Sequence, residues 1–201
     1  MVLDWFLMTS TTRESGSRSR TRKAILDAAV TVLAQRSTAS MAEIADAAEV
    51  GRSTLHRYFP ERSELMTAIF RMTVERLGTA LAEAKLAEGT AAQALRRAVH
   101  AYFELTPALI QVCSEGQQRS EDGWLNAAFE QADKPVVGLI TRAQAEGYLD
   151  QSISPEWIYK VLWWNVFAGI EATGEGLMGK HQAAESVIRL LERGLLAQAG
   201  S

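Results

Sequence analysis

The chain has little of what would indicate a secreted, membrane-spanning or sheet-rich protein. Its single cysteine, Cys113, permits no internal disulfide and no cysteine-based zinc site, which fits a reducing compartment, and we expect a cytoplasmic location. Only four of its 201 residues are proline, the strongest helix breaker, and alanine, leucine, glutamate, glutamine and arginine are abundant. No run approaches the roughly 18 uncharged apolar residues of a membrane span. These absences predict a mostly helical protein with no membrane partner.

The common catalytic motifs are absent as well. The sequence has no Gly-x-Ser-x-Gly elbow, no phosphate loop, no dinucleotide fingerprint and no metal-spaced set of His, Asp and Glu, and it has only three histidines. A catalytic hypothesis would have to rest on a pairing of Cys113 with His100 or on the scattered carboxylates. We therefore predict no catalytic residues, no cofactor and no metal, and a helical enzyme ranks last among the alternatives.

The remaining composition is that of a folded domain. Hydrophobic residues make up 47% and charged residues 22% of the chain, close to globular averages, and the length suits one large domain or two small ones. The apolar run from Val2 to Met8 has no basic region before it and is short for a signal peptide. We expect residues 1–17 to form a disordered or loosely docked extension, and Met8 is a second candidate start.

Charge is distributed unevenly along the chain. The whole chain carries a formal net charge of −3, yet residues 18–62 hold eight arginines and lysines against five acidic residues, a net charge of +3. A basic N-terminal segment on an acidic body is typical of a protein with one end that faces a polyanion. A solvated helix start with scattered arginines would give the same count, so charge alone leaves both interpretations open.

Two short helical patterns follow a longer one near the N-terminus. Apolar residues recur at three- and four-residue spacing between residues 17 and 35, which predicts an amphipathic helix. The inward positions predicted for this helix are Ala24, Ile25, Ala28, Ala29, Val32 and Leu33. Ser40 and Glu43 have the spacing of a capping box, which predicts that the second helix begins after Ser40.

The third helix is predicted over residues 52–59. Residues 49–51 interrupt the preceding helix, and Pro60 ends this one. Leu55 and Phe59 are four residues apart and form its buried side. Two short helices that are joined by a three-residue turn and packed on a longer helix form a helix-turn-helix arrangement.

Helical patterns account for the rest of the chain, which shows no convincing strand period and no internal repeat. The predicted helices cover residues 64–87, 91–105, 107–114, 124–146 with a bend at Pro135, 155–172 and 182–196. The helix that begins at residue 155 has almost no polar face, so it must be covered on every side. Its apolar surface and that of the last helix exceed what a monomer of this size easily hides, which predicts a homodimer.

Residues 40–65 carry a recognisable pattern. They contain Ile-Ala-x-x-Ala-x-Val, beginning at Ile44, and Thr-Leu-x-x-Tyr-Phe-Pro, beginning at Thr54. This segment resembles the helix-turn-helix signature of the tetracycline-repressor (TetR) family of transcriptional regulators. The resemblance implies an all-α fold in which a three-helix DNA-binding domain over residues 18–63 precedes a helical ligand-binding and dimerisation domain over residues 64–201.

In the turn and the third helix, the sequence departs from the family pattern at four positions. Glu49 stands where the turn usually has glycine, and a left-handed backbone there is expected to cost about 1 kcal/mol. Gly51 and Ser53 replace a usual N-cap serine and a usual glycine, and His56 replaces a tyrosine. These changes leave the fold plausible, but they make each expected DNA contact a separate prediction.

The outward side of the helix over residues 52–59 carries residue types that read DNA. Arg52, at the helix start, suits two hydrogen bonds to guanine in the major groove, and Arg57 suits a base or a phosphate. Thr54 and Tyr58 stand at positions that contact phosphate in the family. Ser40, at a helix start, and Arg62, in place of a family lysine, also suit a phosphate contact. The predicted DNA-binding residues are Ser40, Arg52, Ser53, Thr54, His56, Arg57, Tyr58 and Arg62.

Several of these residues have a plain structural alternative. Tyr58 could equally be a half-buried packing residue, and Thr54 could cap its own helix. His56 could contact water alone. A basic stretch before them suits either the DNA backbone and minor groove or a solvated tail. This stretch consists of Arg18, Arg20, Arg22 and Lys23.

In the family, the helices after the DNA-binding domain form a ligand pocket and a dimer interface. The resemblance implies that residues 155–173 and 182–196 pair with their mates as a four-helix bundle. The candidate ligand residues are His100, Phe103, Trp124, Phe129, Trp163, Asn165 and Phe167, together with Cys113. A row of aromatic residues at helical spacing is also typical of a buried core. His100 is equally consistent with a core residue whose hydrogen bonds are made within the protein. Asn165 is the most specific ligand candidate, because a buried amide needs hydrogen-bond partners, which a ligand or the other subunit of the dimer would supply.

The resemblance therefore implies a homodimeric regulator that binds a palindromic operator in double-stranded DNA and is released by a small-molecule effector. The effector would shift the helix that begins near Glu64 and change the distance between the two recognition helices. Repression is expected, and activation stays open. A second alternative is a helix-turn-helix protein that acts through protein partners without sequence-specific DNA binding. The sequence names neither the effector nor the operator.

Overall fold

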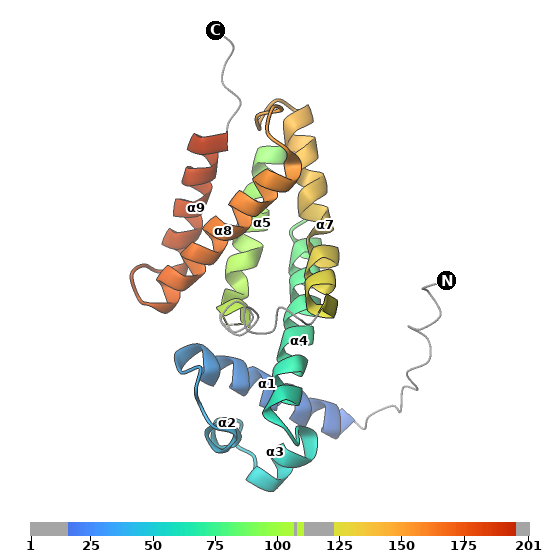
Figure 1. The fold of residues 1–201 in the computed structure, drawn as a ribbon, viewed down its shortest axis with the longest axis vertical. Coiled ribbons are helices and arrows are strands. Elements are labelled where there is room, and N and C mark those ends of the chain that lie inside the picture. Colours follow the sequence, from blue (N-terminus) through green and yellow to red (C-terminus); the bar gives the residue numbers. More distant parts are fainter. Residues whose placement is uncertain (1–15, 107, 111–122, 196–201) are drawn as a thin grey trace, which may run out of the picture.

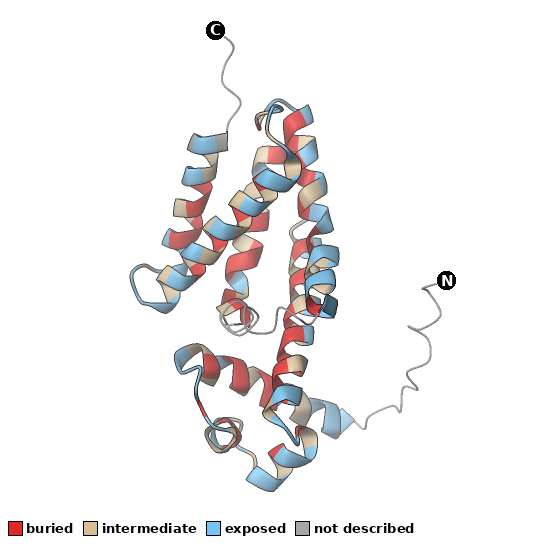
Figure 2. Ribbon diagram, viewed as in Figure 1, coloured by how far each residue is buried: buried red, intermediate tan, exposed pale blue. Residues whose placement is uncertain are grey.

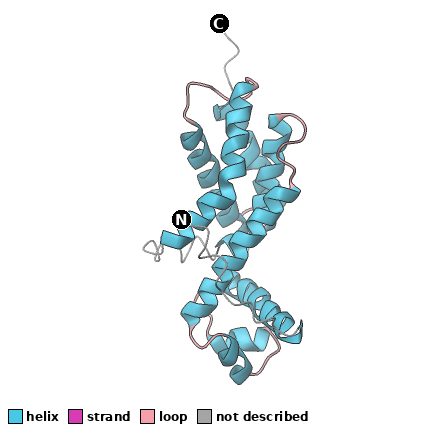
Figure 3. Cartoon of the chain, turned by 90° about the vertical axis from the view of Figure 1, so that its right-hand side faces the viewer, coloured by secondary structure: helices cyan, strands magenta, loops and turns pink. Residues whose placement is uncertain are grey.

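The computed structural model describes residues 16–106, 108–110 and 123–195, and in this part of the chain helices are joined by turns and loops, without a strand (Figure 3). The helices are α1 (Gly16–Gln35), α2 (Met41–Ala47), α3 (Arg52–Tyr58), α4 (Arg62–Glu83), α5 (Ala91–Glu104), α7 (Gly123–Ala145), α8 (Pro155–Gly174) and α9 (Lys180–Leu195). The predicted all-α class is confirmed. Cys113, most of the helix predicted over residues 107–114 and residues 1–15 lie outside the described residues.

The helix ends follow from local chemistry. Ser40 accepts a hydrogen bond from the Glu43 N–H, and the Glu43 side chain accepts one from the Ser40 N–H, so the predicted capping box is confirmed. Ser154 caps α8 with Pro155 in the first turn, where the missing proline N–H costs no helical hydrogen bond. After α7 the chain turns at Gly147, whose φ of 72° favours glycine.

Two buried clusters form the core (Figure 2). The first joins α1, α2 and α3 to the first half of α4, where Leu65, Ile69 and Phe70 are buried, and it also includes Ala108 and, from α7, Leu125. The second joins the second half of α4 to α5, α7, α8 and α9. The molecule therefore has a small N-terminal unit and a larger helical body, and α4 runs from one into the other (Figure 1).

The position of α4 bears on the expected division of the chain. The helix predicted over residues 64–87 begins at Arg62 and ends at Glu83, so residue 63 lies inside its first turn. Leu65 and Phe70 belong to the N-terminal cluster, whereas Leu77 and Leu81 belong to the cluster of the body. The two cores therefore meet within α4, several residues beyond the boundary expected after residue 63.

The buried side of α1 differs from the expected one. Leu26 and Val30 are buried, although neither was predicted to face inward, and Ala24 is exposed. The helix packs against both α2 and α4. Two neighbouring helices widen the buried stripe, and the larger side chains at positions 26 and 30 fill it. Gly16, assigned to the extension, is the first residue of α1, which begins one residue before the predicted helix.

Candidate functional site

The helix-turn-helix lies at one end of the molecule, where α2 and α3 are joined by residues 48–51 (Figure 1). The turn is closed by backbone hydrogen bonds from the N–H of Glu49 to the carbonyl of Asp46, at 3.1 Å, and from the N–H of Val50 to that of Ala45, at 3.0 Å. Glu49 has a φ of 54°, so the predicted left-handed conformation is present in a residue other than glycine. The tight turn sets the angle at which α3 leaves α2.

The short helix α3 has two sharply different sides. Leu55 is 2% exposed and anchors the helix, and Phe59, directly after it, is 3% exposed. The polar side chains of the opposite side reach solvent and are those of Arg52, Ser53, His56 and Arg57. Gly51 caps the helix without a side-chain hydrogen bond, which leaves the first-turn amides uncovered by a side chain. This side has the shape and chemistry that a DNA-reading helix requires.

Arginines from α1 gather beside the end of α3. The guanidinium carbons of Arg18 and Arg57 lie 5.9 Å and 5.8 Å from the centre of the Tyr58 ring. That of Arg22 lies 5.4 Å from the centre of the Phe59 ring. Cation–π contacts of this length hold the positive charges close to the aromatic faces. The basic stretch of α1 and the end of α3 therefore form one positively charged surface, with Tyr58 half-buried between them.

Two predicted phosphate contacts have other partners. The hydroxyl of Ser40 donates to the carboxylate of Glu43 at 2.9 Å, and the hydrogen bonds from Ser40 lower the pKa of that carboxyl. Arg62 donates from its guanidinium to the carbonyls of Ala39, at 2.5 Å, and of Ser37, at 2.8 Å. Both residues therefore fix the segment that leads into α2.

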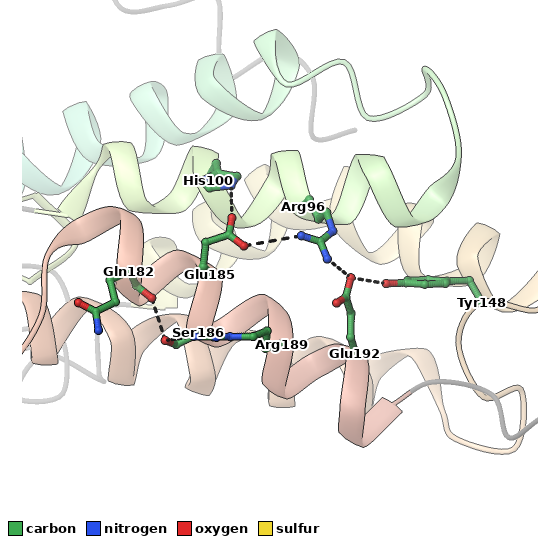
Figure 4. A network of polar contacts seen from close by, with 8 residues as sticks. All are labelled: Arg96, His100, Tyr148, Gln182, Glu185, Ser186, Arg189 and Glu192. Atoms are coloured by element: carbon green, nitrogen blue, oxygen red, sulfur yellow. Dashed lines mark hydrogen bonds and ion pairs between the residues drawn. The ribbon is translucent and has the colours of Figure 1, made fainter.

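The candidate ligand residues that the structure describes are divided between a polar network, the core and the surface. His100 is part of a polar network between α5 and α9, in which it contacts Glu185 at 3.4 Å and Arg96 joins Glu185 to Glu192 (Figure 4). Asn165 donates to the carbonyl of Val161 in its own helix at 2.7 Å. This internal partner was not among the two that we expected for the amide.

The aromatic candidates divide between the core and the surface. Phe103 is buried, and Trp163 packs edge-on against the buried Tyr102 ring with 5.8 Å between ring centres. Trp124 is 39% exposed, and the guanidinium carbon of Arg71 lies 5.3 Å from the centre of its ring. Phe129 packs against both core clusters, and Phe167 contacts Trp164 edge-on.

One polar residue of the body was missed by the sequence analysis. Asp133 in α7 is only 2% exposed. It accepts hydrogen bonds from the hydroxyls of Tyr102 in α5, at 2.5 Å, and Tyr159 in α8. Burial raises its pKa above the ordinary value of 3.8. A signal was available, because Asp133 follows Phe129 by four residues and so continues the apolar stripe of α7.

A small apolar cavity lies elsewhere in the body. Its volume is about 30 Å³, and it is lined by side chains of α5, α7, α8 and α9, including Val99, Ile140 and Leu162. None of the candidate ligand residues that the structure describes lines it.

The outer face of α8 remains uncovered. Trp157 and Trp164, seven residues and two turns apart, are 59% and 56% exposed, and Leu190 of α9 is 61% exposed. The expectation that α8 is buried on every side is therefore not met within one chain. No described helix is both long and apolar enough to cross a bilayer.

The two short helices, the tight turn and the polar outer side of α3 define a helix-turn-helix protein. Residues 25–69 match the family model of bacterial regulatory proteins of the tetR family. The chain is 39% identical over 189 residues to the HTH-type transcriptional repressor LfrR of Mycolicibacterium smegmatis, covering 94% of this chain and 97% of the relative. The chain belongs to the TetR family of transcriptional regulators, as the sequence predicts.

Solved structures agree with this assignment. The crystal structure of the TetR-like regulator LfrR from Mycobacterium smegmatis in complex with proflavine has a TM-score of 0.79 at 37% identity and covers 90% of this chain and 99% of that one. A second LfrR crystal structure has a TM-score of 0.63 at 33% identity, over 86% and 98% of the two chains. The ketosteroid regulator KstR2 of Mycobacterium tuberculosis shares the fold at 16% identity, with a TM-score of 0.72 over 87% and 94% of the chains.

Proposed function

We propose that the protein is a homodimeric repressor that places α3 of each subunit in the major groove of a palindromic operator. The observation that carries this proposal is the division of α3 into a buried side with Leu55 and an exposed side that starts with Arg52. The name of LfrR, a transcriptional repressor, supports repression rather than activation. A repressor acts on chromosomal DNA, so the proposed location is the cytoplasm.

The exposed side of α3 provides the proposed sequence-reading residues. Arg52 reads a guanine, Arg57 contacts a base or a phosphate, and Ser53 and His56 face the groove. Thr54 and Tyr58 contact phosphate, and the arginines of α1 follow the backbone or enter the minor groove. Because the side chains of Ser40 and Arg62 bind the segment before α2, their proposed contribution is to hold that segment against the phosphates.

The exposed tryptophans of α8 support a dimer. Trp157 and Trp164 share a face of α8, and Leu190 of α9 is exposed as well. Burying them against a second copy would remove a large apolar area from water, at roughly 25 cal/mol per Å². In this proposal α8 and α9 pair with their mates and set the spacing of the two α3 helices.

A small molecule bound in the body is proposed to release the operator. The helix α4 carries core residues of both units, so a shift of α4 in the body moves the helix-turn-helix. A change in α3 spacing then prevents both copies from engaging their half-sites together. The LfrR complex with proflavine makes flat polycyclic compounds the first effectors to test.

A mobility-shift and footprint assay on DNA that flanks the gene tests the proposal. Arg52→Ala and Tyr58→Ala are expected to abolish or strongly weaken the shift. Lys134→Ala is the matched control, because Lys134 is an exposed cation on α7, outside the two helices of the proposed dimer. Affinity should fall steeply with salt, since each neutralised phosphate releases a counterion. Failure to retard any genomic fragment at low salt would exclude the DNA-binding function, and unchanged binding by both variants would favour an action through protein partners.

A further inference from the structure

Two arginines beside the helix-turn-helix are held by aromatic rings instead of carboxylates. The guanidinium carbon of Arg22 in α1 lies 5.4 Å from the centre of the Phe59 ring. That of Arg71 in α4 lies 5.3 Å from the centre of the Trp124 ring in α7. Within residues 16–106, 108–110 and 123–195, neither guanidinium forms an ion pair or donates a hydrogen bond to the protein. An aromatic face attracts the cation but leaves its N–H donors available to an anion.

Both arginines line the same hollow in the surface. It has a volume of about 340 Å³ and lies between α1, the end of α3 and the first half of α4. The lining also includes Tyr58 and Ser63, which carry hydroxyl groups, and one acidic residue, Glu64. Two cations therefore face a single carboxylate in the hollow. Guanidinium groups next to hydroxyl groups are the donors that proteins use to bind phosphate.

The hollow adjoins the surface that is proposed to face the operator. Tyr58, one of the proposed phosphate contacts, is part of its lining. A DNA strand carries one phosphate per about 3.4 Å of helix axis, so a strand that contacts Tyr58 brings further phosphates close to the hollow. An operator phosphate is therefore the anion that its position favours.

Trp124 connects the hollow to the body. It lies in the first turn of α7, and α7 packs against α4. A free arginine side chain has many rotamers, and ordering it on binding costs free energy. A ring that already holds Arg71 reduces this cost. A displacement of α7 would withdraw the ring, and the ordering of Arg71 would then weaken DNA binding.

We propose that Arg22 and Arg71 form a subsite for a backbone phosphate of the operator, and that Trp124 is the positioning residue of Arg71. This inference rests on the proposed function, because it extends the proposed DNA contacts from α1 and α3 along α4. It also gives the body a second influence on the operator. Movement of α7 changes the affinity of each half-site by itself, in addition to any change in the spacing of the α3 helices.

Arg71→Ala tests the phosphate contact in mobility-shift titrations at several salt concentrations. Affinity should fall on the order of tenfold for the operator and for unrelated DNA alike, because a phosphate contact carries no sequence information. The slope of log K against log salt should become shallower by about 1, since one phosphate fewer is neutralised. Lys134→Ala removes an equal charge from an exposed site on α7 and should leave affinity and slope unchanged. An unchanged slope for Arg71→Ala overturns the subsite.

A double-mutant cycle tests the positioning role of Trp124. Arg71 and Trp124 are both exposed, so neither change opens a cavity in the core. Trp124→Leu removes the aromatic face and should weaken DNA binding severalfold, whereas Trp124→Phe keeps a ring and should retain most of the affinity. In the Arg71→Ala background, Trp124→Leu should have no further effect, because the side chain that it positions is gone. Equal effects of Trp124→Leu in the two backgrounds overturn the positioning role.

Calorimetric titration of the free protein with inorganic pyrophosphate separates the operator from a small phosphorylated ligand. Pyrophosphate should bind no better than about millimolar, because most of the affinity for an operator phosphate comes from the contacts around it. Micromolar binding that Arg71→Ala abolishes would assign the hollow to a free phosphorylated ligand and overturn the inference. Native DNA binding by Arg71→Ala overturns the subsite alone, whereas failure of the native sequence to retard any genomic fragment refutes the proposed function as well.

Discussion

Gly169 of α8 lies directly against the ring of Phe103 in α5. A Cβ atom at residue 169 would be 2.7 Å from Cζ of Phe103 and 3.1 Å from Cγ2 of Val187 in α9. Phe103 is 1% exposed and Val187 is 3% exposed, so neither side chain has free space to move into. The missing side chain at this position sets how closely α8 approaches its two neighbours.

Gly169→Ala is therefore expected to lower the free energy of unfolding by about 1–3 kcal/mol, the usual cost of overpacking a core. Gly138→Ala is the matched control, because Gly138 is exposed in α7 and a Cβ there meets nothing within 4 Å. This control should raise the stability by up to about 1 kcal/mol through helix propensity. Urea unfolding measures both, and equal effects of the two changes would contradict the close packing.

The left-handed Glu49 predicts that glycine improves the turn. With a φ of 54°, Glu49→Gly should raise the free energy of unfolding by about 1 kcal/mol at most, since glycine tolerates this conformation but loses more entropy on folding. Lys85, with a φ of 50° beyond the end of α4, offers the same test in the body. Chemical denaturation gives both values.

A second variant of Glu49 tests the effect of its negative charge apart from the backbone strain. Glu49→Gln keeps the backbone strain and removes a negative charge next to the proposed DNA surface. Its expected effect is tighter operator binding in a mobility-shift titration, with unfolding unchanged. A stability gain in this variant would show that the strain explanation of the glycine variant is wrong.

The exposed face of α8 predicts that one charge breaks the proposed dimer. Trp164→Glu should give a monomer in analytical ultracentrifugation at concentrations where the native sequence is dimeric, because a carboxylate would have to be buried without a partner. Thr141→Glu adds the same charge on the exposed side of α7 and should leave the mass unchanged. A monomeric native sequence at every concentration would refute the α8–α9 pairing.

Asp133 makes stability depend on pH with an unusual sign for a carboxyl group. Burial raises its pKa in the folded state above the ordinary 3.8, so at a pH between the two pKa values the folded protein holds a proton that the unfolded chain has lost. Its contribution to stability is therefore complete below the ordinary value and is lost as the pH rises through the raised pKa. Relative to Asp133→Asn, the native sequence should lose stability over that window in urea unfolding. Parallel pH curves would contradict the raised pKa.

The Glu43 carboxyl makes stability depend on pH in the opposite direction. Hydrogen bonds from Ser40, and then the contact with Arg36, lower the pKa of Glu43 below the ordinary 4.5. The folded state therefore favours the ionised form, and this contribution is present above the ordinary value and lost as the pH falls through the lowered pKa. Compared with Glu43→Gln, the native sequence should lose stability on acidification, in the same unfolding experiment. A gain on acidification would show that the capping box does not hold the charge.

The helix-turn-helix was predictable because its determinants are local. The spacing of Leu55 and Phe59, the capping pair of Ser40 and Glu43, and the stop at Pro60 act within one or two turns of helix. They gave the right elements and the right buried side of α3. In α1 the same reasoning misplaced part of the buried stripe, since the width of that stripe depends on where α2 and α4 pack.

The buried polar cluster of the body could not be predicted in the same way. Asp133, Tyr102 and Tyr159 lie on three different helices, and no pattern along one helix indicates that their side chains meet. The sequence analysis favoured Asn165 as a contact to a ligand or across the dimer, but its amide has a partner within its own helix. An acidic residue in the apolar stripe of α7 was the available sign, but its partners come from the tertiary arrangement.

The shared helix α4 has a practical consequence for anyone who wishes to study the two units apart. A fragment that stops at residue 63 would lack Leu65, Met66, Ile69 and Phe70, all of which are buried in the N-terminal core. Such a fragment would leave α1 and α3 with an open apolar face and would aggregate rather than fold. Truncations and domain exchanges with relatives should therefore keep α4 whole and join the chains after Glu83.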